Sequence, residues 1–344
     1  MTLRTLMLIA SVPLERGEAL RQHLDTAGLL DVRHRIRRAE GRLLIPVIGE
    51  PVIDLALYAA EWIDADAPAV PAAPPPFDRI RERVDLPAEL QGLLPRKWEL
   101  LGNVLLMTLP PELHSHRTAI GEAYAEVLAV KTVAVYSTIH GDWRHPTVER
   151  LWGDGTETTH LENGLRYRMD VAQVMFSSGN LPERIRMGRA CSPGETVVDL
   201  CAGIGYFALA IAVKGGARVH ACEVNPVAFH YLVENARINR ATTLLPIAGD
   251  CREVAPRGVA DRVVLGYLDG EIFLPTAMHA FRDGGTLHYH EACPEPLAET
   301  RPLERVRMAA KDAGLAVTSH TLRYLKSYSP GVWHVVLDVD LARP

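Results

Sequence analysis

Two glycines and three carboxylates in the second half of the chain have the types and spacing of a nucleotide-binding site. Gly203 and Gly205 follow the apolar stretch VVDLCA, in the order strand, glycine turn, helix. Glycines permit a tight turn and the close approach of a ligand, which the amides of the following helix then face. Asp199, Glu223 and Asp250 each end an apolar stretch. Ligands of open α/β sheets bind at the carboxyl ends of the strands, so we expect these acids to surround one ligand.

The position of Asp199 separates the two ligands that such a loop commonly holds. Glu223 suits a ribose diol in either case, because a carboxylate accepts hydrogen bonds in pairs. Asp199 would repel the pyrophosphate of a nicotinamide dinucleotide, but it would attract a cationic amino-acid head such as that of S-adenosylmethionine. Asp250 would then accept a hydrogen bond from the adenine amino group. The residues therefore favour S-adenosylmethionine and leave the dinucleotide open. For each of the three acids, the alternative is a solvated side chain at the end of a strand.

The elements around these residues alternate between strand and helix from about residue 191 onward. This order implies a parallel sheet with helices on both faces, and the last two strands are expected to form a closing hairpin. We therefore predict an α/β, Rossmann-like domain with a mixed seven-stranded sheet. Beside the stretch that leads to Asp250, the expected strands are 196–201, 217–222, 262–267, 285–291, 316–322 and 333–340, with helices at 206–214, 226–238, 274–281 and 303–313.

Three segments precede this domain, which is assigned to residues 191–344. Residues 1–66 show a strand, a helix and a strand, which predicts a small α+β domain. The segment APAVPAAPPP at 67–76 has five prolines in ten residues and is typical of a semi-rigid linker. Residues 77–190 have a mixed α+β pattern, in which 171–176 is expected to be extended.

The composition indicates a folded protein of two or three domains. The chain has 344 residues, of which 48% are hydrophobic and 23% charged. Its net charge of −5 argues against non-specific coating of nucleic acid and leaves room for a local basic patch. The five cysteines form no C-x-x-C pair, so we expect no zinc site, no disulfide framework and a cytoplasmic location. No uncharged apolar stretch reaches about 18 residues, so no membrane span is expected.

Several stretches of the chain resemble one family of tRNA enzymes. DLCAGIGYF, HACEVNP and GDC together resemble a class I S-adenosylmethionine-dependent enzyme. RMDVAQVMFSSGNLPERIRM (168–187), HGDWRHPTVERLWG (140–153), LENGLRYRMD (161–170) and KSYSPGVWHVVLDV (326–339) are similar to a family with two branches. One branch holds tRNA (guanine-N1-)-methyltransferases that act beside the anticodon. The other holds the aminocarboxypropyl transferases of wybutosine synthesis.

Two glycines favour the wybutosine branch, including its archaeal members. Gly266 in LGYLDGEIFLP stands where the methyltransferase branch has an asparagine, and Gly179 in MFSSGN stands where that branch has an arginine. HYHEACPE (288–295) also resembles the wybutosine branch. The resemblance implies transfer of the 3-amino-3-carboxypropyl group of S-adenosylmethionine to 4-demethylwyosine beside the anticodon of tRNA-Phe. Because sulfur leaves as a neutral thioether, positioning should matter more than acid–base catalysis.

The N-terminal segment keeps the methyltransferase alternative open. GLLDVRHRIRRAEGRLLIPV (28–47) resembles the first domain of the archaeal methyltransferase branch, which contacts the outer corner of the tRNA. A guanine-N1 methyltransferase at the same nucleotide, or a bifunctional enzyme, is therefore an alternative. A tRNA-binding module without catalysis and a nicotinamide dehydrogenase are more distant ones. Alternation along a strand places three arginines on one face, where they bind RNA phosphates or are merely solvated; the candidate RNA-binding residues are Arg33, Arg35, Arg37 and Arg38.

The strand ends and the resemblance together imply the site residues. Gly266 and Tyr267 should line the target side of the site. Arg144 would clamp a phosphate or the substrate, and Glu183 would accept a proton or form an ion pair with Arg184 or Arg186. His288 and His290 alternate on a strand and are expected to be structural. The expected cofactor-binding residues are Asp199, Ala202, Gly203, Gly205, Tyr206, Glu223, Asp250 and Arg184.

Overall fold

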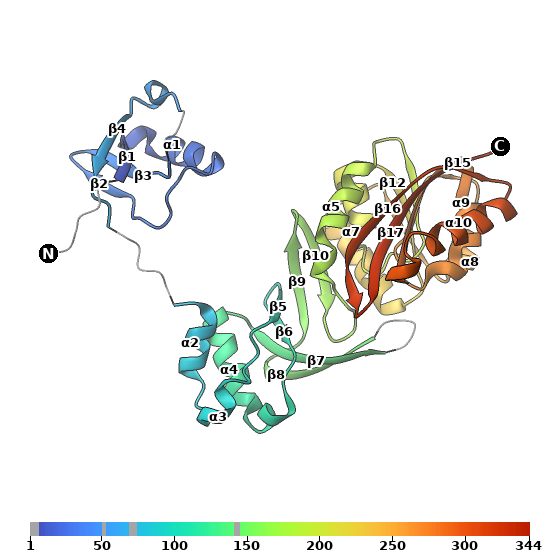
Figure 1. The fold of residues 1–344 in the computed structure, drawn as a ribbon, viewed down its shortest axis with the longest axis horizontal. Coiled ribbons are helices and arrows are strands. Elements are labelled where there is room, and N and C mark those ends of the chain that lie inside the picture. The colour runs from blue at the N-terminus through green and yellow to red at the C-terminus, as the bar shows by residue number, and fades with distance from the viewer. Residues whose placement is uncertain (1–6, 50–52, 69–73, 141–144) are drawn as a thin grey trace. The chain divides into compact units, whose positions relative to one another are not determined.

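The computed structural model describes residues 7–49, 53–68, 74–140 and 145–344, without the side chains of 137–140 and 145 (Figure 1). Its described residues form two compact units, divided between Asp78 and Arg79. Arg144 lies outside the described residues, so its predicted role stays a prediction. The four-part division of the chain stays a prediction as well.

The first unit is a four-stranded antiparallel sheet covered by a helix. The sheet has the order β2-β3-β1-β4, formed by Arg37–Ala39, Arg42–Pro46, Met7–Pro13 and Glu61–Ala65. Helix α1 (Leu14–Thr26) packs its buried Leu20 and Leu24 against this sheet. Burial of these apolar side chains is the main force that holds a helix of this length on a sheet.

The second unit begins with elements that surround a small mixed sheet. Its order is β5-β6-β7-β8. A two-stranded ribbon, β9 and β10, follows and leads to α5. The elements are α2 (Pro76–Arg83), α3 (Ala88–Gln91), β5 (Trp98–Leu101), β6 (Val104–Met107), α4 (Arg117–Leu128), β7 (Thr132–His140), β8 (His145–Gly153), β9 (Glu157–Glu162), β10 (Leu165–Asp170) and α5 (Leu181–Ala190).

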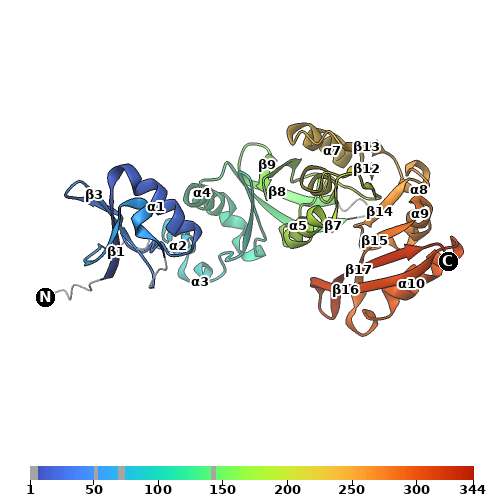
Figure 2. The ribbon, with the colours of Figure 1, turned by 90° about the horizontal axis from the view of Figure 1, so that it is seen from above.

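The remainder of the second unit is the seven-stranded sheet that the sequence predicts. Its order is β13-β12-β11-β14-β15-β17-β16, with parallel pairing from β13 to β15 and antiparallel pairing to β17 and β16. Figure 2 shows β16 and β17 as the red hairpin that closes the sheet. The strands are β11 (Thr196–Asp199), β12 (Arg218–Glu223), β13 (Leu244–Ala248), β14 (Ala260–Leu265), β15 (Phe281–Pro294), β16 (Ala316–Ser329) and β17 (Val332–Ala342). The predicted α/β fold with a mixed sheet is confirmed.

Helices cover both faces of this sheet. Buried side chains of α5 and α7 (Pro226–Ile238) form one core, which also includes Tyr167 of β10 and Leu106 of β6. Helices α9 (Leu274–Ala280) and α10 (Arg301–Asp312) form the core on the other face. Figure 1 shows these pairs of helices on opposite sides of the strands.

One local prediction is wrong, and another is correct only in part. Residues 171–176 form a turn and an irregular segment, because Val171, Val174 and Phe176 are buried by packing and not by strand pairing. The helix expected at 206–214 is irregular, since α6 (Ala208–Ala210) passes directly into a π-helical turn at Ile211–Gly215. Among the described residues, no helix has the length and apolar character that crossing a membrane requires.

Candidate functional site

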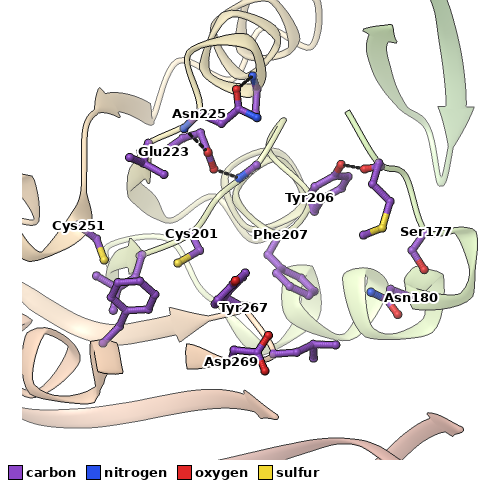
Figure 3. A pocket seen from close by; sticks show the side chains of 18 of the residues that line it. Ser177, Asn180, Cys201, Tyr206, Phe207, Glu223, Asn225, Cys251, Tyr267 and Asp269 are labelled. Carbon is purple, nitrogen blue, oxygen red and sulfur yellow. Dashed lines mark hydrogen bonds between the residues drawn. The ribbon is translucent and has the colours of Figure 1, made fainter. Parts of the chain in front are cut away.

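A cavity of about 760 Å³ opens where β11, β12, β13 and β14 end (Figure 3). Its size is within the range of small-molecule sites, and it lies at the edge where ligands of open α/β sheets bind. Seven of the predicted site residues line it: Arg184, Gly203, Tyr206, Glu223, Asp250, Gly266 and Tyr267. The described residues contain no group of three or more histidines, cysteines or acids placed to hold a metal ion.

The glycine loop between β11 and α6 forms one wall of the cavity. Gly203 and Gly205 have φ values of +57° and +99°, which side chains other than glycine rarely adopt. A Cβ on Gly205 would lie 2.9 Å from Cγ of Leu209, so the loop also needs glycine for packing. Gly205 and the buried Ala202 do not line the cavity. They shape the loop from behind, and their predicted contact with the cofactor stays a prediction.

Glu223 ties the glycine loop to the start of α7. Its Oε2 accepts a hydrogen bond of 2.7 Å from the Gly203 amide, and its Oε1 accepts one of 2.8 Å from the Asn225 amide. Asn225 in turn caps α7 by accepting a hydrogen bond from Val227. Burial raises the pKa of Glu223, although these amides oppose the shift. The carboxylate therefore organises two backbone segments and still lines the cavity, where its remaining lone pairs can face a diol.

Asp199 lies behind the cavity wall and not on it. Its side chain is fully buried, and Oδ1 accepts a long hydrogen bond of 3.4 Å from the Cys201 amide. Oδ2 is buried without a hydrogen-bond partner in the described residues. Burial raises the pKa of Asp199 to about 7. Asp199 therefore does not line the cavity in this structure, and its predicted contact with a ligand head stays a prediction.

The end of the cavity beside β13 holds an aspartate, an arginine and an aromatic ring. Asp250 caps α8 (Cys251–Val254) by accepting a hydrogen bond of 2.9 Å from the Arg252 amide. The Arg252 guanidinium also binds this carboxylate and lies over the Phe273 ring, 5.5 Å from its centre. The hydrogen bond from Arg252 lowers the pKa of Asp250. This end offers an acceptor and flat surfaces, which suit a nucleobase.

Two charged residues of α5 have structural partners. Arg184 donates two hydrogen bonds of 2.6 Å to Glu162 and lies over the Phe176 ring, so it supports the cavity wall that it lines. Glu183 is 2% exposed, pairs with Arg186 through hydrogen bonds of 2.8 and 2.5 Å, and does not line the cavity. Of the two roles considered for Glu183, the structure shows the ion pair, and its partner is Arg186.

Gly266 and Tyr267 form the wall at the end of β14. A Cβ on Gly266 would lie 2.8 Å from Cε2 of Phe207, so the missing side chain lets this ring come close. Tyr267 contacts the Phe273 ring edge-on at 6.1 Å. The hydroxyl of Tyr206 donates to the Met175 carbonyl, which ties the glycine loop to the segment before α5. The wall on this side is small and aromatic (Figure 3).

Sequence reasoning did not single out several residues of the cavity. Ser177, Asn180 and Lys326 line it, and Nζ of Lys326 donates a hydrogen bond of 2.8 Å to Oγ of Ser177. His334 also lines the cavity, and its Nε2 lies 3.0 Å from Nδ1 of His290. The stretches MFSSGN and KSYSPGVWH contain all of these except His290, but no spacing rule in one sequence marks a particular position as cavity-lining.

The arginines of the first unit are exposed, but they do not alternate along one strand. Arg33 lies in a turn and donates two hydrogen bonds, of 2.8 and 2.9 Å, to the buried Asp31. Arg35 precedes the strand, and only Arg37 and Arg38 belong to β2. The expected shared strand face is therefore wrong, since the strand begins later than the pattern indicated. All four side chains are exposed.

Comparisons with known proteins match the chain along most of its length. Residues 158–318 match the TRM5/TYW2 methyltransferase domain, residues 80–156 the TYW2 N-terminal domain, and residues 11–54 the tRNA methyltransferase 5 N-terminal domain. The chain is 44% identical to the tRNA(Phe) (4-demethylwyosine(37)-C(7)) aminocarboxypropyltransferase of Pyrococcus horikoshii, over 76% of this chain and 95% of that protein. It is 34% identical to the tRNA (guanine(37)-N(1))-methyltransferase Trm5b of Pyrococcus abyssi, over 96% of this chain and 98% of that protein.

A solved structure agrees with these matches. The crystal structure of P. horikoshii TYW2 in complex with MeSAdo is 42% identical, with a TM-score of 0.71, and the match covers 78% of this chain and all of that one. The relatives therefore share the fold of this chain. In this chain that fold consists of a mixed seven-stranded sheet, with the glycine loop bound to Glu223 at the end of β12. The chain belongs to the TRM5/TYW2 family.

Proposed function

We propose that the chain transfers the 3-amino-3-carboxypropyl group of S-adenosylmethionine to 4-demethylwyosine in tRNA(Phe). The observation that carries this proposal is the 44% identity to an archaeal relative that bears this activity in its name, over almost the whole of that relative. The identity to the methyltransferase relative is lower, at 34%. The aromatic wall beside Gly266 and Tyr267 supports the proposal, because a flat tricyclic base stacks well on such a surface.

The cavity fits the donor in size and in the chemistry of its walls. Glu223 would accept hydrogen bonds from the ribose hydroxyls, and Asp250 would accept one from the adenine amino group. Phe273 offers its ring to the adenine at the same end. The donor supplies a sulfonium, whose sulfur leaves as a neutral thioether. A ring carbon of the base would form a bond to the methylene of the aminocarboxypropyl arm as the bond from that methylene to sulfur breaks, which leaves methylthioadenosine, and the ring carbon would then lose its proton to solvent. What the chain supplies is orientation of that methylene toward the base.

Guanine-N1 methylation at the same nucleotide is the second candidate. The match of residues 11–54 to the tRNA methyltransferase 5 N-terminal domain favours it, as does the alignment with Trm5b over 96% of this chain. One site can serve both reactions in principle, since the methyl and the aminocarboxypropyl carbon are attached to the same sulfur. A bifunctional enzyme is therefore part of this candidate.

Product analysis separates the two candidates. The full chain is incubated with tRNA(Phe) that carries 4-demethylwyosine, and separately with unmodified tRNA(Phe), using donor labelled either in the methyl or in the carboxypropyl group. Carboxypropyl label in the nucleoside together with methylthioadenosine is the expected result. Methyl label in the nucleoside together with S-adenosylhomocysteine would replace the first candidate by the second.

We further propose how the tRNA and the chain meet. The anticodon stem-loop would enter at the cavity, with Arg144 holding a phosphate or the base. Residues 1–66 would contact the outer corner of the tRNA through exposed arginines, and 67–76 would act as the linker. The reactions would take place in the cytoplasm, and the five free cysteines are consistent with a reducing compartment.

A further inference from the structure

Three polar side chains meet at the end of the cavity opposite Asp250. Ser177 lies in the segment before α5, Asn180 is the residue that precedes this helix, and Lys326 comes from β16. The backbone N–H of Asn180 donates to the backbone carbonyl of Ser177 at 3.2 Å, and Nζ of Lys326 donates to the side-chain Oγ of Ser177 at 2.8 Å. Figure 3 shows Ser177 and Asn180 across the cavity from Cys251, with Tyr206, Phe207 and Tyr267 between.

The ammonium of Lys326 packs closely against Gly179. A Cβ built on Gly179 would lie 3.2 Å from Nζ of Lys326, so an alanine there would require the ammonium to shift by a few tenths of an ångström. Two other cations line the cavity at other places, where Arg184 binds Glu162 and Arg252 binds Asp250. Lys326 adds a third positive charge, beside a hydroxyl and an amide. The ammonium of Lys326, the hydroxyl of Ser177 and the side-chain N–H groups of Asn180 are donors of the kind that bind a carboxylate.

Asn180 adds an acceptor to this group. Its Oδ1 is buried and has no hydrogen-bond partner in the described residues, which is costly unless a ligand supplies an N–H. Its side chain makes no capping hydrogen bond to α5, so the helix gives no other reason for its position. A cation, an amide and a hydroxyl at one place thus match a zwitterion, with a carboxylate on one side and an ammonium on the other.

We infer that Lys326, Ser177 and Asn180 bind the amino-acid head of the donor. Lys326 and Ser177 hold its carboxylate, and Asn180 accepts a hydrogen bond from its ammonium. The distance of this group from the Asp250 end agrees with the donor's own layout, since the amino-acid head and the adenine lie on opposite sides of the ribose. This inference rests on the proposed function, and it assigns residues that fix which part of the donor is presented for transfer.

Calorimetry with three ligands tests the assignment. The probes are S-adenosylmethionine, decarboxylated S-adenosylmethionine, which lacks only the carboxylate, and methylthioadenosine, which lacks the whole head. Lys326→Met is expected to weaken binding of S-adenosylmethionine about tenfold or more, because a charge-assisted contact is lost. Binding of the other two should change less than about twofold, and Lys326→Arg should recover part of the loss.

Two further variants complete the design. Asn180→Ala should weaken binding of both ligands that carry the ammonium, S-adenosylmethionine and its decarboxylated form, and leave the affinity for methylthioadenosine unchanged. Lys311→Met, the same substitution at an exposed position of α10, is the matched control and should change none of them. Because methylthioadenosine reports on the rest of the cavity, retained affinity for it shows that each variant is folded.

The inference would be overturned if Lys326→Met weakened binding of all three ligands equally, or if it left binding of S-adenosylmethionine unchanged. It would also be overturned by a variant that binds all three normally and loses only affinity for tRNA, since Lys326 would then contact an RNA phosphate. A wild-type chain that binds none of the probes would overturn the proposed function together with the inference. Normal binding and transfer by the wild type, combined with unselective effects of the variants, would overturn the inference alone.

Discussion

Glu223 is the residue on which the glycine loop and the start of α7 both depend. Its two oxygens accept hydrogen bonds from amides on two different segments, and it faces the cavity at the same time. In Glu223→Gln one oxygen becomes an N–H that meets a backbone N–H, so a buried donor loses its acceptor. We expect the free energy of unfolding to fall by about 1–3 kcal/mol, measured by urea denaturation.

The same substitution should also weaken binding of the donor, S-adenosylmethionine. Calorimetry is expected to show at least about tenfold weaker binding of S-adenosylmethionine, because the ribose loses an ionised acceptor and the loop loses its anchor. Glu253→Gln, on the exposed side of α8, is the control. Unchanged affinity in Glu223→Gln would show that the ribose is not held at this carboxylate.

Asp199 gives a second prediction at the scale of a residue, and its sign follows from burial. The pKa is raised to about 7, so the folded chain retains a proton on this group that the unfolded chain releases near pH 4. Stability is therefore lost as the pH rises from about 4 to about 7, after which the loss is constant. Asp199→Asn removes this titration, and its stability relative to wild type should increase across that interval and then level off.

Thermal unfolding of the donor-free protein at several pH values measures this difference. Asp312→Asn, at the exposed C-terminal end of α10, is the control for the loss of a carboxylate elsewhere in the chain. A constant difference between Asp199→Asn and wild type would mean that Asp199 is ionised in the folded chain throughout this interval. The burial described for Oδ2 would then have to be relieved by a group or a water near the loop.

At the scale of elements, a partly buried cluster of charged and polar side chains joins β17 and β15 to α5. Asp338 of β17 accepts hydrogen bonds from Arg186 of α5 at 2.7 Å, from Arg323 of β16 at 3.0 Å and from His288 of β15 at 2.5 Å. Arg262 donates to Nε2 of His288, which leaves Nδ1 as the N–H that Asp338 receives. Although burial acts in the opposite direction, these partners hold the pKa of Asp338 well below its usual range.

The stability that Asp338 contributes is present at neutral pH and is lost as the pH falls below about 4, where the unfolded chain takes up a proton first. Asp338→Asn should lower the free energy of unfolding by about 1–3 kcal/mol at pH 7, because it removes the charged acceptor of the part-buried Arg186 and of the buried His288. The deficit should shrink in acid. Urea denaturation at pH 7 and at about pH 3 checks this, and an equal deficit at both values would contradict the sign.

The elements of the sheet could be predicted because each has a strong local signal. Apolar runs ended by Asp199 and Glu223, and the glycines between strand and helix, fix the parallel part of the fold from short stretches of sequence. Residues 171–176 were wrongly expected to be extended, because an apolar run shows burial and does not distinguish a strand from a packed irregular segment. The late start of β2 at Arg37 was missed because the Asp31–Arg33 interaction favours a turn.

The cavity was predictable only in part, for a related reason. Gly203, Glu223 and Asp250 lie at or just after the ends of neighbouring parallel strands, so the order of strands and turns brings them together. Lys326 and His334 come from the last two strands, and their presence at the cavity depends on the antiparallel closure of the sheet. No local pattern expresses that long-range pairing, so these two residues could be identified only from the structure.

At the scale of the whole molecule, residues 80–156 and 11–54 match two different N-terminal domain families, and the proposed contact of the first unit with the outer corner of the tRNA can be tested. Arg35, Arg37 and Arg38 of the first unit are exposed and carry no acidic partner among the hydrogen bonds and ion pairs described for them, unlike Arg33, which binds Asp31. Arginines of this kind bind phosphates and add to affinity without selecting sequence. Replacing the three by alanine in the full chain should therefore raise the KM for whole tRNA about fivefold or more and flatten its salt dependence.

The same triple variant should act normally on an isolated anticodon stem-loop that carries 4-demethylwyosine, because that substrate lacks the outer corner. A matched triple replacement of exposed arginines in the second unit, Arg257, Arg307 and Arg343, controls for the change in net charge. If both triple variants raise the KM for whole tRNA equally, the effect is one of overall charge. If the first also impairs the stem-loop, then the first unit acts on the anticodon region itself, and the division of labour proposed between the two units has to be given up.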